Sequence, residues 1–162
     1  MKTQALIFDL DGTLLDSLAD LAYFANQTLE THGFTTHPEA AYNQFAGYGA
    51  RELIRLATGL EDDAHIDRLA HDFKTRYEAE VTRSSTLYEG VRELLNTLDT
   101  LTLKKAILTN KPHKPALKVH EALFSPWRFE AVLGFREGVP RKPHPQAALE
   151  IAQTLEVEPQ SF

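Results

Sequence analysis

The 162-residue sequence contains no cysteine, which excludes disulfide bonds, thiolate metal sites and thiol catalysis. It also has no apolar stretch close to the roughly 18 residues that a membrane-spanning helix needs. The apolar stretch near the N-terminus is short and acidic residues follow it at once, unlike in a signal peptide. We therefore expect a cytoplasmic protein that makes no contact with a membrane.

Positive charge is scarce as well, because 17 Lys and Arg residues face 23 Asp and Glu residues, for a formal net charge of -6. Proteins that bind the phosphate backbone of nucleic acids usually carry a basic face, and no basic stripe is evident here. We expect no nucleic-acid partner. Any anion-binding site in this chain must be local rather than a property of the whole surface.

Short apolar runs alternate with helical patterns toward both ends of the chain. Buried strands are predicted from three apolar runs, at residues 5–10, 104–109 and 129–133. Helices are predicted from apolar residues at helical spacing, at residues 14–31, 91–98, 115–123 and 145–155. Alternation of strands and helices indicates βαβ units and therefore an α/β fold with a parallel sheet.

The middle of the chain shows only helical signals. Residues 51–58 and 62–81 are predicted helices, and the glycine-containing segment FAGYGA at 45–50 marks a break before them. We expect an α/β core built from residues 1–15 and 84–162, interrupted by an all-helical insert at residues 16–83.

Two aspartates, Asp9 and Asp11, end the first predicted strand in the segment FDLDGTLLDS. Ligands of open parallel sheets bind beyond the carboxyl ends of the strands. One Asp carboxylate can attack phosphorus while a second acid transfers a proton. Two carboxylates this close repel each other, so a divalent cation such as Mg²⁺ is expected beside them. The alternative is a turn with an incidental acidic pair, which the preceding strand and the following Gly12 disfavour.

Two further segments carry groups that suit a phosphate ester. Thr109 and Asn110, in ILTNK, end the second predicted strand and can donate hydrogen bonds to phosphate oxygens. Lys142, in RKPHP, lies between a loop and a predicted helix start and can neutralise a phosphate. Taken alone, the first segment could be an ordinary turn and the second a solvated surface charge. Their occurrence after the aspartates, in this order, favours a common site.

The three segments together resemble the motifs of the haloacid dehalogenase superfamily, in particular its phosphoglycolate-phosphatase-like branch. FDLDGTLLDS is similar to the first motif of that family, ILTNK to the second and RKPHP to the third. The helical insert resembles the family's cap domain, and LYEGVRELL resembles the return of the chain to the core. The resemblance implies a Rossmann-like parallel-sheet core with an inserted all-helical cap.

The resemblance also implies a role for each site residue. Asp9 would be the nucleophile, Asp11 the general acid/base, and Lys142 the residue that stabilises the charge of Asp9 and the phosphate. The Asp9 carboxylate and the Asp11 backbone carbonyl would bind Mg²⁺. The transferring phosphoryl group would be held by Gly12, Thr109 and Asn110.

The insert contains a segment, FAGYGARELI, at the place where family members carry a loop that determines substrate specificity. By the resemblance, Gly47 and Gly49 would let the backbone approach a small substrate, and Arg51 could reach a carboxylate. The alternative is a plain turn between two helices followed by an exposed arginine.

The sequence departs from the family in one respect. A fourth motif, a strand that ends in Gly-Asp with a further acid nearby, would begin just after Phe162 and is absent from these residues. The resemblance then implies a Mg²⁺ site short of a carboxylate and a core that is incomplete at its C-terminal side. We expect either a fragment of a longer protein or a truncated product.

The leading hypothesis is a Mg²⁺-dependent phosphomonoesterase of small phosphorylated metabolites, with 2-phosphoglycolate as the first candidate. A sugar-phosphate phosphatase, a phosphomutase and a pyrophosphatase are alternatives on the same scaffold. A truncated, non-catalytic phosphate-binding module is an alternative of another class. Both a monomer and a homodimer are compatible with the sequence.

Overall fold

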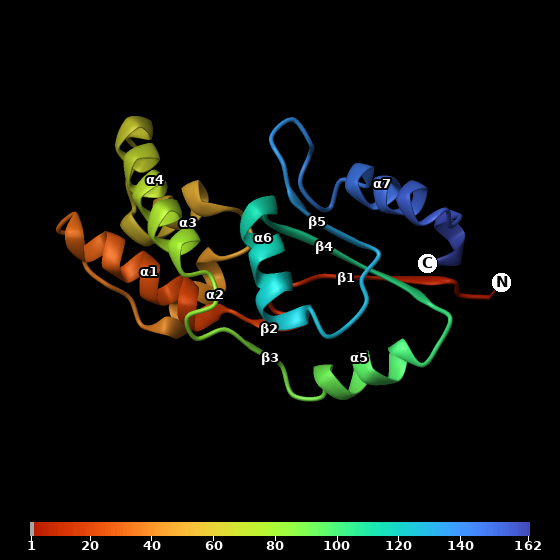
Figure 1. The fold of residues 1–162 in the computed structure, drawn as a ribbon. Helices are drawn as coiled ribbons and strands as arrows, with labels where there is room; N and C mark the ends of the chain where they lie inside the picture. The colour runs from red at the N-terminus through yellow and green to blue at the C-terminus, as the bar shows by residue number, and fades with distance from the viewer. Residues whose placement is uncertain (1) are drawn as a thin grey trace. The chain divides into compact units, whose positions relative to one another are not determined.

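The computed structural model describes residues 2–162 (Figure 1). The chain forms two compact units, one made of Met1–Asp16 with Thr86–Phe162 and the other of Ser17–Ser85. The first unit contains a parallel sheet and helices, and the second contains helices alone. No helix within the described residues is both long enough and apolar enough to cross a membrane.

The α/β unit is built on a three-stranded parallel sheet. Its strands are β1 (Ala5–Phe8), β4 (Lys104–Pro112) and β5 (Ala131–Phe135), in the order β1-β4-β5. The predicted parallel α/β fold is confirmed. The strand bounds differ slightly from the prediction, because β4 runs three residues past Thr109 and β5 begins two residues after Phe129.

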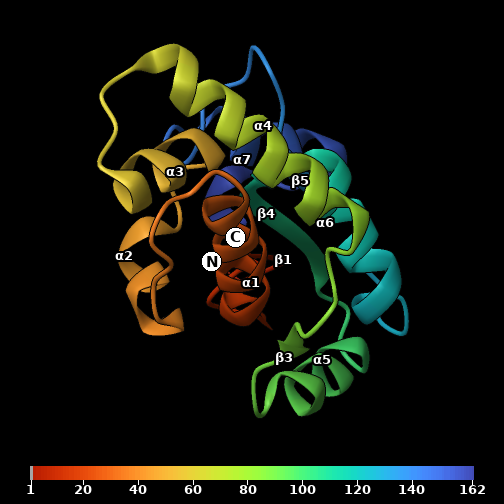
Figure 2. The same ribbon diagram turned by 90° about the vertical axis from the view of Figure 1, so that its left-hand side faces the viewer.

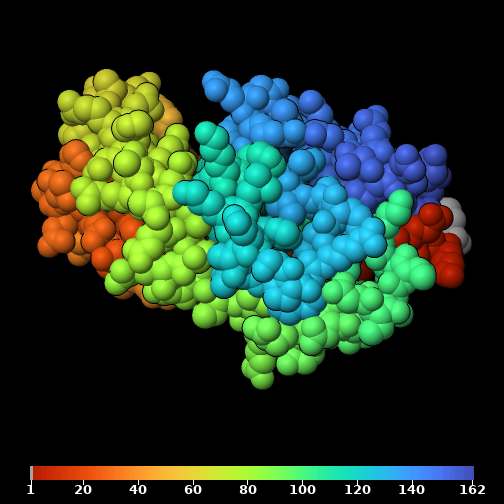
Figure 3. Space-filling view, viewed as in Figure 1, coloured from red at the N-terminus to blue at the C-terminus, as the bar shows by residue number. Residues whose placement is uncertain are grey.

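Helices cover both faces of this sheet (Figures 1 and 2). Helix α7 (Gln146–Leu155) packs Ile151 and Leu155 against Ala106 and Leu108 of β4. Helices α5 (Val91–Asp99) and α6 (His113–Val119) lie on the other side, and α6 continues into the π-helical segment η2 (His120–Phe124). On the face shown in Figure 3, side chains from α5 onward fill the surface of this unit. Burial on both faces explains why these strands appear as continuous apolar runs.

A shift in pairing register shapes the end of β4. Leu108 pairs with Leu133 of β5, but the next pair is Pro112 with Phe135, so β4 carries extra residues between them. Gly134 faces this irregularity: a Cβ there would lie 2.6 Å from the carbonyl oxygen of Lys111. Glycine therefore permits the close approach of β5 to the bulged segment that contains Thr109–Lys111.

One predicted element is wrong at its start. The apolar spacing predicted a helix from Leu14, whereas β2 (Leu15–Asp16) pairs with β3 (Thr86–Leu87) in a two-stranded antiparallel sheet. Helix α1 (Leu18–Thr31) begins only after this pair. The carbonyl of Leu10 accepts the N–H groups of the next turn, from residues 13 to 15, at 2.9–3.2 Å. This tight turn and the pairing with β3, a partner distant in sequence, override the local helical pattern.

The second unit, Ser17–Ser85, is all-helical. After α1 it contains the 3₁₀ turn η1 (Glu39–Ala41) and three helices, α2 (Tyr42–Phe45), α3 (Ala50–Thr58) and α4 (Asp63–Ala79). Fully buried side chains from each helix form its core, among them Leu29, Tyr42, Ile54 and Leu69. Buried Asp20 joins the two ends of the unit, because its carboxylate accepts the N–H groups of Ser84 and Ser85 at 2.7 and 2.9 Å.

Candidate active site

Asp9 lies directly after β1, at the carboxyl edge of the sheet. Its Oδ1 atom accepts the N–H of Leu10 at 2.7 Å and lies 2.7 Å from the Nζ atom of Lys142. Within residues 2–162, the Oδ2 atom of Asp9 accepts no hydrogen bond. The side chain is 44% exposed. One carboxylate oxygen is therefore fixed by two donors, and the other remains open to a ligand.

Lys142 is held at three points. Its Nζ atom reaches Asp9 and also donates to the carbonyl of Leu108 at 2.8 Å. Its backbone N–H donates to the Oδ1 atom of Asn110 at 2.9 Å, and its carbonyl accepts from the Nδ2 atom of Asn110 at 3.3 Å. The resemblance assigned Asn110 to binding of the phosphoryl group. The structure adds a different function for the side chain, which fixes the backbone of Lys142 beside β4.

A second ion pair lies beside the first and was not predicted. The Nζ atom of Lys111 is 2.7 Å from the Oδ1 atom of Asp11, and the Lys111 side chain is only 3% exposed. A buried lysine remains charged only where a carboxylate or other acceptor compensates for the lost water. In the sequence, Lys111 lies two residues beyond the predicted strand at 104–109, and nothing local indicated its partner.

Thr109 lies at the bulge of β4 and is buried. Its Oγ1 atom accepts the N–H of Lys111 at 3.1 Å. In the part of the chain that the structure describes, its hydroxyl hydrogen has no acceptor. Thr109 can therefore still donate one hydrogen bond to an anion at the carboxyl edge of the sheet.

Gly12 occupies a tight turn, with φ +78°. This left-handed conformation is one that glycine adopts without strain. The N–H of Gly12 donates to the carbonyl of Leu15 at 2.9 Å, so in this structure it is used within the turn. The resemblance assigned this residue to phosphate binding, and the structure places it next to Asp11 with its donor engaged.

The residues predicted to recognise substrate lie in the helical unit. Gly47 and Gly49, with φ +95° and +93°, flank Tyr48, whose side chain is well exposed. Arg51 follows at the start of α3. Its guanidinium pairs with the carboxylates of Asp63 and Asp67, the latter at 2.9 Å. These carboxylates raise the pKa of Arg51. Its charge is already balanced within its own unit.

The charges at the carboxyl edge of the sheet are matched. Asp9 and Asp11 face Lys142 and Lys111, so the four side chains together carry no net charge. Within the described residues, no three His, Asp or Glu side chains gather as a metal-binding group. Mg²⁺ needs only one or two carboxylates when water and substrate phosphate complete its octahedron. The Asp9 carboxylate and the nearby turn carrying Asp11 fit such an ion.

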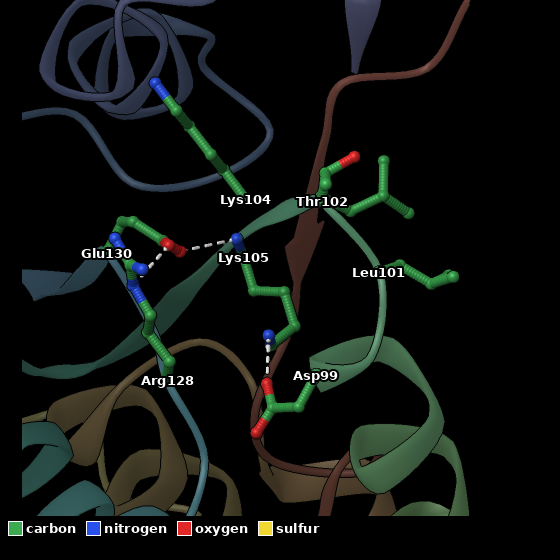
Figure 4. Close-up of a pocket in the computed structure, with 8 residues that line it drawn as sticks. Asp99, Leu101, Thr102, Lys104, Lys105, Arg128 and Glu130 are labelled. Carbon is green, nitrogen blue, oxygen red and sulfur yellow. Dashed lines mark hydrogen bonds and ion pairs between the residues drawn. The ribbon is translucent and has the colours of Figure 1, made fainter.

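A separate hollow of about 440 Å³ lies at the opposite, amino end of β4 (Figure 4). In it the Nζ atom of Lys105 lies 2.5 Å from Asp99, and the backbone N–H of Lys105 donates to Glu130 at 2.7 Å. Arg128 pairs with Glu130 at 2.9 Å. The carboxylates in this hollow bind the cations around them, and ligands of parallel sheets bind at the other edge. The candidate site is therefore the carboxyl edge.

Comparison with known proteins identifies relatives over nearly the whole chain. A model of the family described as haloacid dehalogenase-like hydrolase matches residues 6–162. A phosphoglycolate phosphatase of Rhodobacter capsulatus is 37% identical over 155 residues, which cover 93% of this chain and 70% of that protein. An N-acetylmuramic acid 6-phosphate phosphatase of Pseudomonas aeruginosa is 28% identical, over 98% of this chain and 71% of that protein.

Solved structures have the same fold. A crystal structure of "a predicted phosphoglycolate phosphatase" from Haemophilus somnus superimposes with a TM-score of 0.87 and 26% identity. The superposition covers 99% of this chain and 75% of that one. The present chain thus corresponds to about three quarters of the solved protein's length.

Proposed function

Because the chain belongs to the haloacid dehalogenase-like hydrolases, on the branch of the phosphoglycolate phosphatases, we propose that it is a Mg²⁺-dependent phosphomonoesterase. We further propose an aspartyl-phosphate intermediate on Asp9. The observation that supports this most strongly is the state of the Asp9 carboxylate, whose Oδ1 atom is held by Lys142 and Leu10 while its Oδ2 atom is open within the described residues.

In the first step, the Oδ2 atom of Asp9 attacks phosphorus in line with the ester oxygen. The new bond from Oδ2 to phosphorus forms as the bond to the ester oxygen breaks. Asp11, in its protonated form, donates its proton to the leaving alkoxide. Lys142 offsets charge on Asp9 and on the phosphoryl group, and the Thr109 hydroxyl donates to a phosphoryl oxygen.

In the second step, a water molecule attacks the phosphorus of the aspartyl-phosphate. Asp11 now accepts a proton from that water, and the bond from phosphorus to Oδ2 breaks to release inorganic phosphate. Lys111 holds the Asp11 side chain in position for both proton transfers. The Asp9 carboxylate and the Asp11 backbone carbonyl would hold Mg²⁺, which would neutralise the phosphoryl charge.

We propose that residues 16–83 act as a cap that selects the substrate, with Gly47, Gly49 and Arg51 in its specificity loop. A small substrate, 2-phosphoglycolate, is the first candidate, since the relative from Rhodobacter capsulatus is a phosphoglycolate phosphatase. A phosphorylated sugar acid is the second candidate. It is favoured by the relative that is an N-acetylmuramic acid 6-phosphate phosphatase.

The test is Mg²⁺-dependent release of inorganic phosphate by the 162-residue chain. Substrates would be 2-phosphoglycolate, N-acetylmuramic acid 6-phosphate and an aryl phosphate, with Asp9→Asn as the blank and a chelator as the metal control. We expect release that disappears in Asp9→Asn and in the presence of chelator. A folded chain that releases no phosphate from any of the three would refute the proposed activity of this chain.

A further inference from the structure

Arg141 directly precedes Lys142 in the loop between β5 and α7, and its guanidinium lies over an aromatic ring. It is half-buried, and its guanidinium carbon lies 3.9 Å from the ring centroid of Phe135, the last residue of β5. The carbonyl of Arg141 accepts the N–H of His144 at 3.0 Å. The loop and the aromatic ring thus hold the guanidinium in one place.

Within residues 2–162, no carboxylate lies within 4.0 Å of the Arg141 guanidinium. Arg51, Arg55 and Arg136 each pair with a carboxylate, and these partners raise their pKa. Burial instead lowers the pKa of Arg141. A cation that has lost part of its water without gaining a counter-ion is unfavourable unless a ligand supplies the anion.

Arg141 lies next to the candidate active site. Adjacent Cα atoms are about 3.8 Å apart, and the next residue, Lys142, is fixed to Asn110 through its backbone and to Asp9 through its Nζ atom. A small molecule with a phosphoryl group at Asp9 can therefore present a second group to this loop. The guanidinium lies over the Phe135 ring, and its N–H groups that point away from the ring can still form the paired hydrogen bonds that suit a carboxylate.

We propose that Arg141 binds the carboxylate of the substrate and so determines specificity for carboxylate-bearing phosphate esters. This inference rests on the proposed function, whose phosphoryl site it extends. In this proposal Arg141, and not Arg51, is the main residue that binds the carboxylate, because Arg51 is already paired. Arg51 could bind the substrate carboxylate only after breaking its ion pairs with Asp63 and Asp67.

The experiment compares two ligands that differ in the carboxylate, 2-phosphoglycolate and ethyl phosphate. Dissociation constants would be measured by calorimetry with Mg²⁺ in the Asp9→Asn background, alone and combined with Arg141→Gln or Arg141→Lys. Arg92→Gln is the matched control, because Arg92 also stacks on an aromatic ring, that of Trp127 at 5.4 Å, in α5. Thermal unfolding would verify that each variant is folded.

We expect Arg141→Gln to weaken 2-phosphoglycolate binding by about tenfold to a hundredfold, the usual effect of losing hydrogen bonds to a charged group. The dissociation constant of ethyl phosphate should change by less than about threefold. The ratio of the dissociation constants of the two ligands should therefore change. Arg141→Lys should restore part of the ratio, and Arg92→Gln should leave it as in the parent.

Equal weakening of both ligands, no weakening of either, or a parent that does not bind 2-phosphoglycolate would each overturn the inference. The proposed activity is tested separately by phosphate release with Asp9 intact. A chain that shows the expected binding ratio but releases no phosphate would keep the carboxylate site and refute the turnover.

Discussion

The two ends of strand β4 each contain a buried lysine paired with an aspartate. At the amino end, Lys105 pairs with Asp99, and at the carboxyl end, Lys111 pairs with Asp11; both lysine side chains are 3% exposed. The aspartates are also alike, at 31% and 28% exposure. Burial and pairing therefore do not distinguish the end of the strand for which we propose a chemical function from the end for which we propose a structural one.

What differs is the set of groups next to each pair. At the carboxyl end, the pair stands beside Lys142 and Asp9, whose Oδ2 atom is open within the described residues. At the amino end, the neighbouring carboxylate, Glu130, binds the backbone of Lys105 and the side chain of Arg128. An ion pair becomes part of a reactive site when the surrounding groups leave an atom available to a ligand.

The largest effect is expected at the open oxygen. Asp9→Asn removes the proposed nucleophile and should lower the rate of phosphate release by at least about a thousandfold, as loss of a covalent nucleophile usually does. Because the side chain is well exposed, the variant should remain folded. Phosphate release and thermal unfolding, measured on the same preparation, check both parts. A variant that retains half of the parent rate would show that Asp9 is not the nucleophile.

The second-largest effect is expected to distinguish Lys111 from Lys105. Lys111→Met leaves Asp11 without the ammonium group that positions it, and misplacement of a catalytic group costs about tenfold to a hundredfold in kcat. KM should change little, since Lys111 is proposed to act on Asp11 and not on the substrate. Steady-state kinetics test this, with Lys105→Met as the matched control. If both variants lower kcat per folded molecule equally, the carboxyl and amino ends of β4 do not differ in their contribution to catalysis.

A smaller effect, on stability alone, is expected at the amino end. Lys105→Met leaves Asp99 unpaired, and because Asp99 is partly exposed we expect a loss of only about 1–2 kcal/mol in the free energy of unfolding. Urea denaturation measures this loss. The double variant Lys105→Met/Asp99→Leu, which removes both charges, should recover part of it. No recovery would mean that the charge of Asp99 is not the cause.

The smallest effect concerns pH. The His120 ring packs against Phe129, with ring centroids 5.7 Å apart, and its Nε2 atom has no partner within the described residues. Burial lowers the pKa of His120 below its ordinary value of 6.5. As the pH falls below about 6.5, the unfolded chain therefore binds a proton before the folded chain does, and the free energy of unfolding decreases. Above this range the contribution is constant.

Denaturation at pH 7.5 and pH 5.5 measures that decrease, and His120→Leu should make it smaller. The ring of Phe129 also lies 6.0 Å from the Nζ atom of Lys105. We therefore group the effect of His120 with the amino end of β4, for which we propose a structural role. If the free energy of unfolding decreases equally in the parent and in His120→Leu, the pH dependence arises from other groups.

The sequence predicted the elements that depend on local pattern. The runs at residues 5–10 and 104–109 became β1 and β4 because strands buried on both faces are apolar throughout. The aspartates, Thr109 and Lys142 converge because parallel strands end at one edge of the sheet. The β2–β3 pair was missed because its partners are about 70 residues apart and only two residues long on each side.

The pairing of Lys111 with Asp11 could not be predicted for a related reason. The two residues are 100 positions apart, and their contact depends on the bulge at the end of β4. The interaction of the Asn110 side chain with Lys142 likewise depends on how the loop after β5 folds back. Sequence patterns indicated which residues share the edge, but the choice of partners required the tertiary structure.

The most direct test of covalent catalysis by Asp9 is a search for phosphate on this residue. The chain would be mixed with Mg²⁺ and 2-phosphoglycolate, quenched in acid after one turnover time, digested, and examined by mass spectrometry. We expect one phosphoryl group on the peptide that contains Asp9, and none when Asp9→Asn is treated in the same way. Phosphate release by the parent without any modified Asp9, and unchanged by Asp9→Asn, would contradict it.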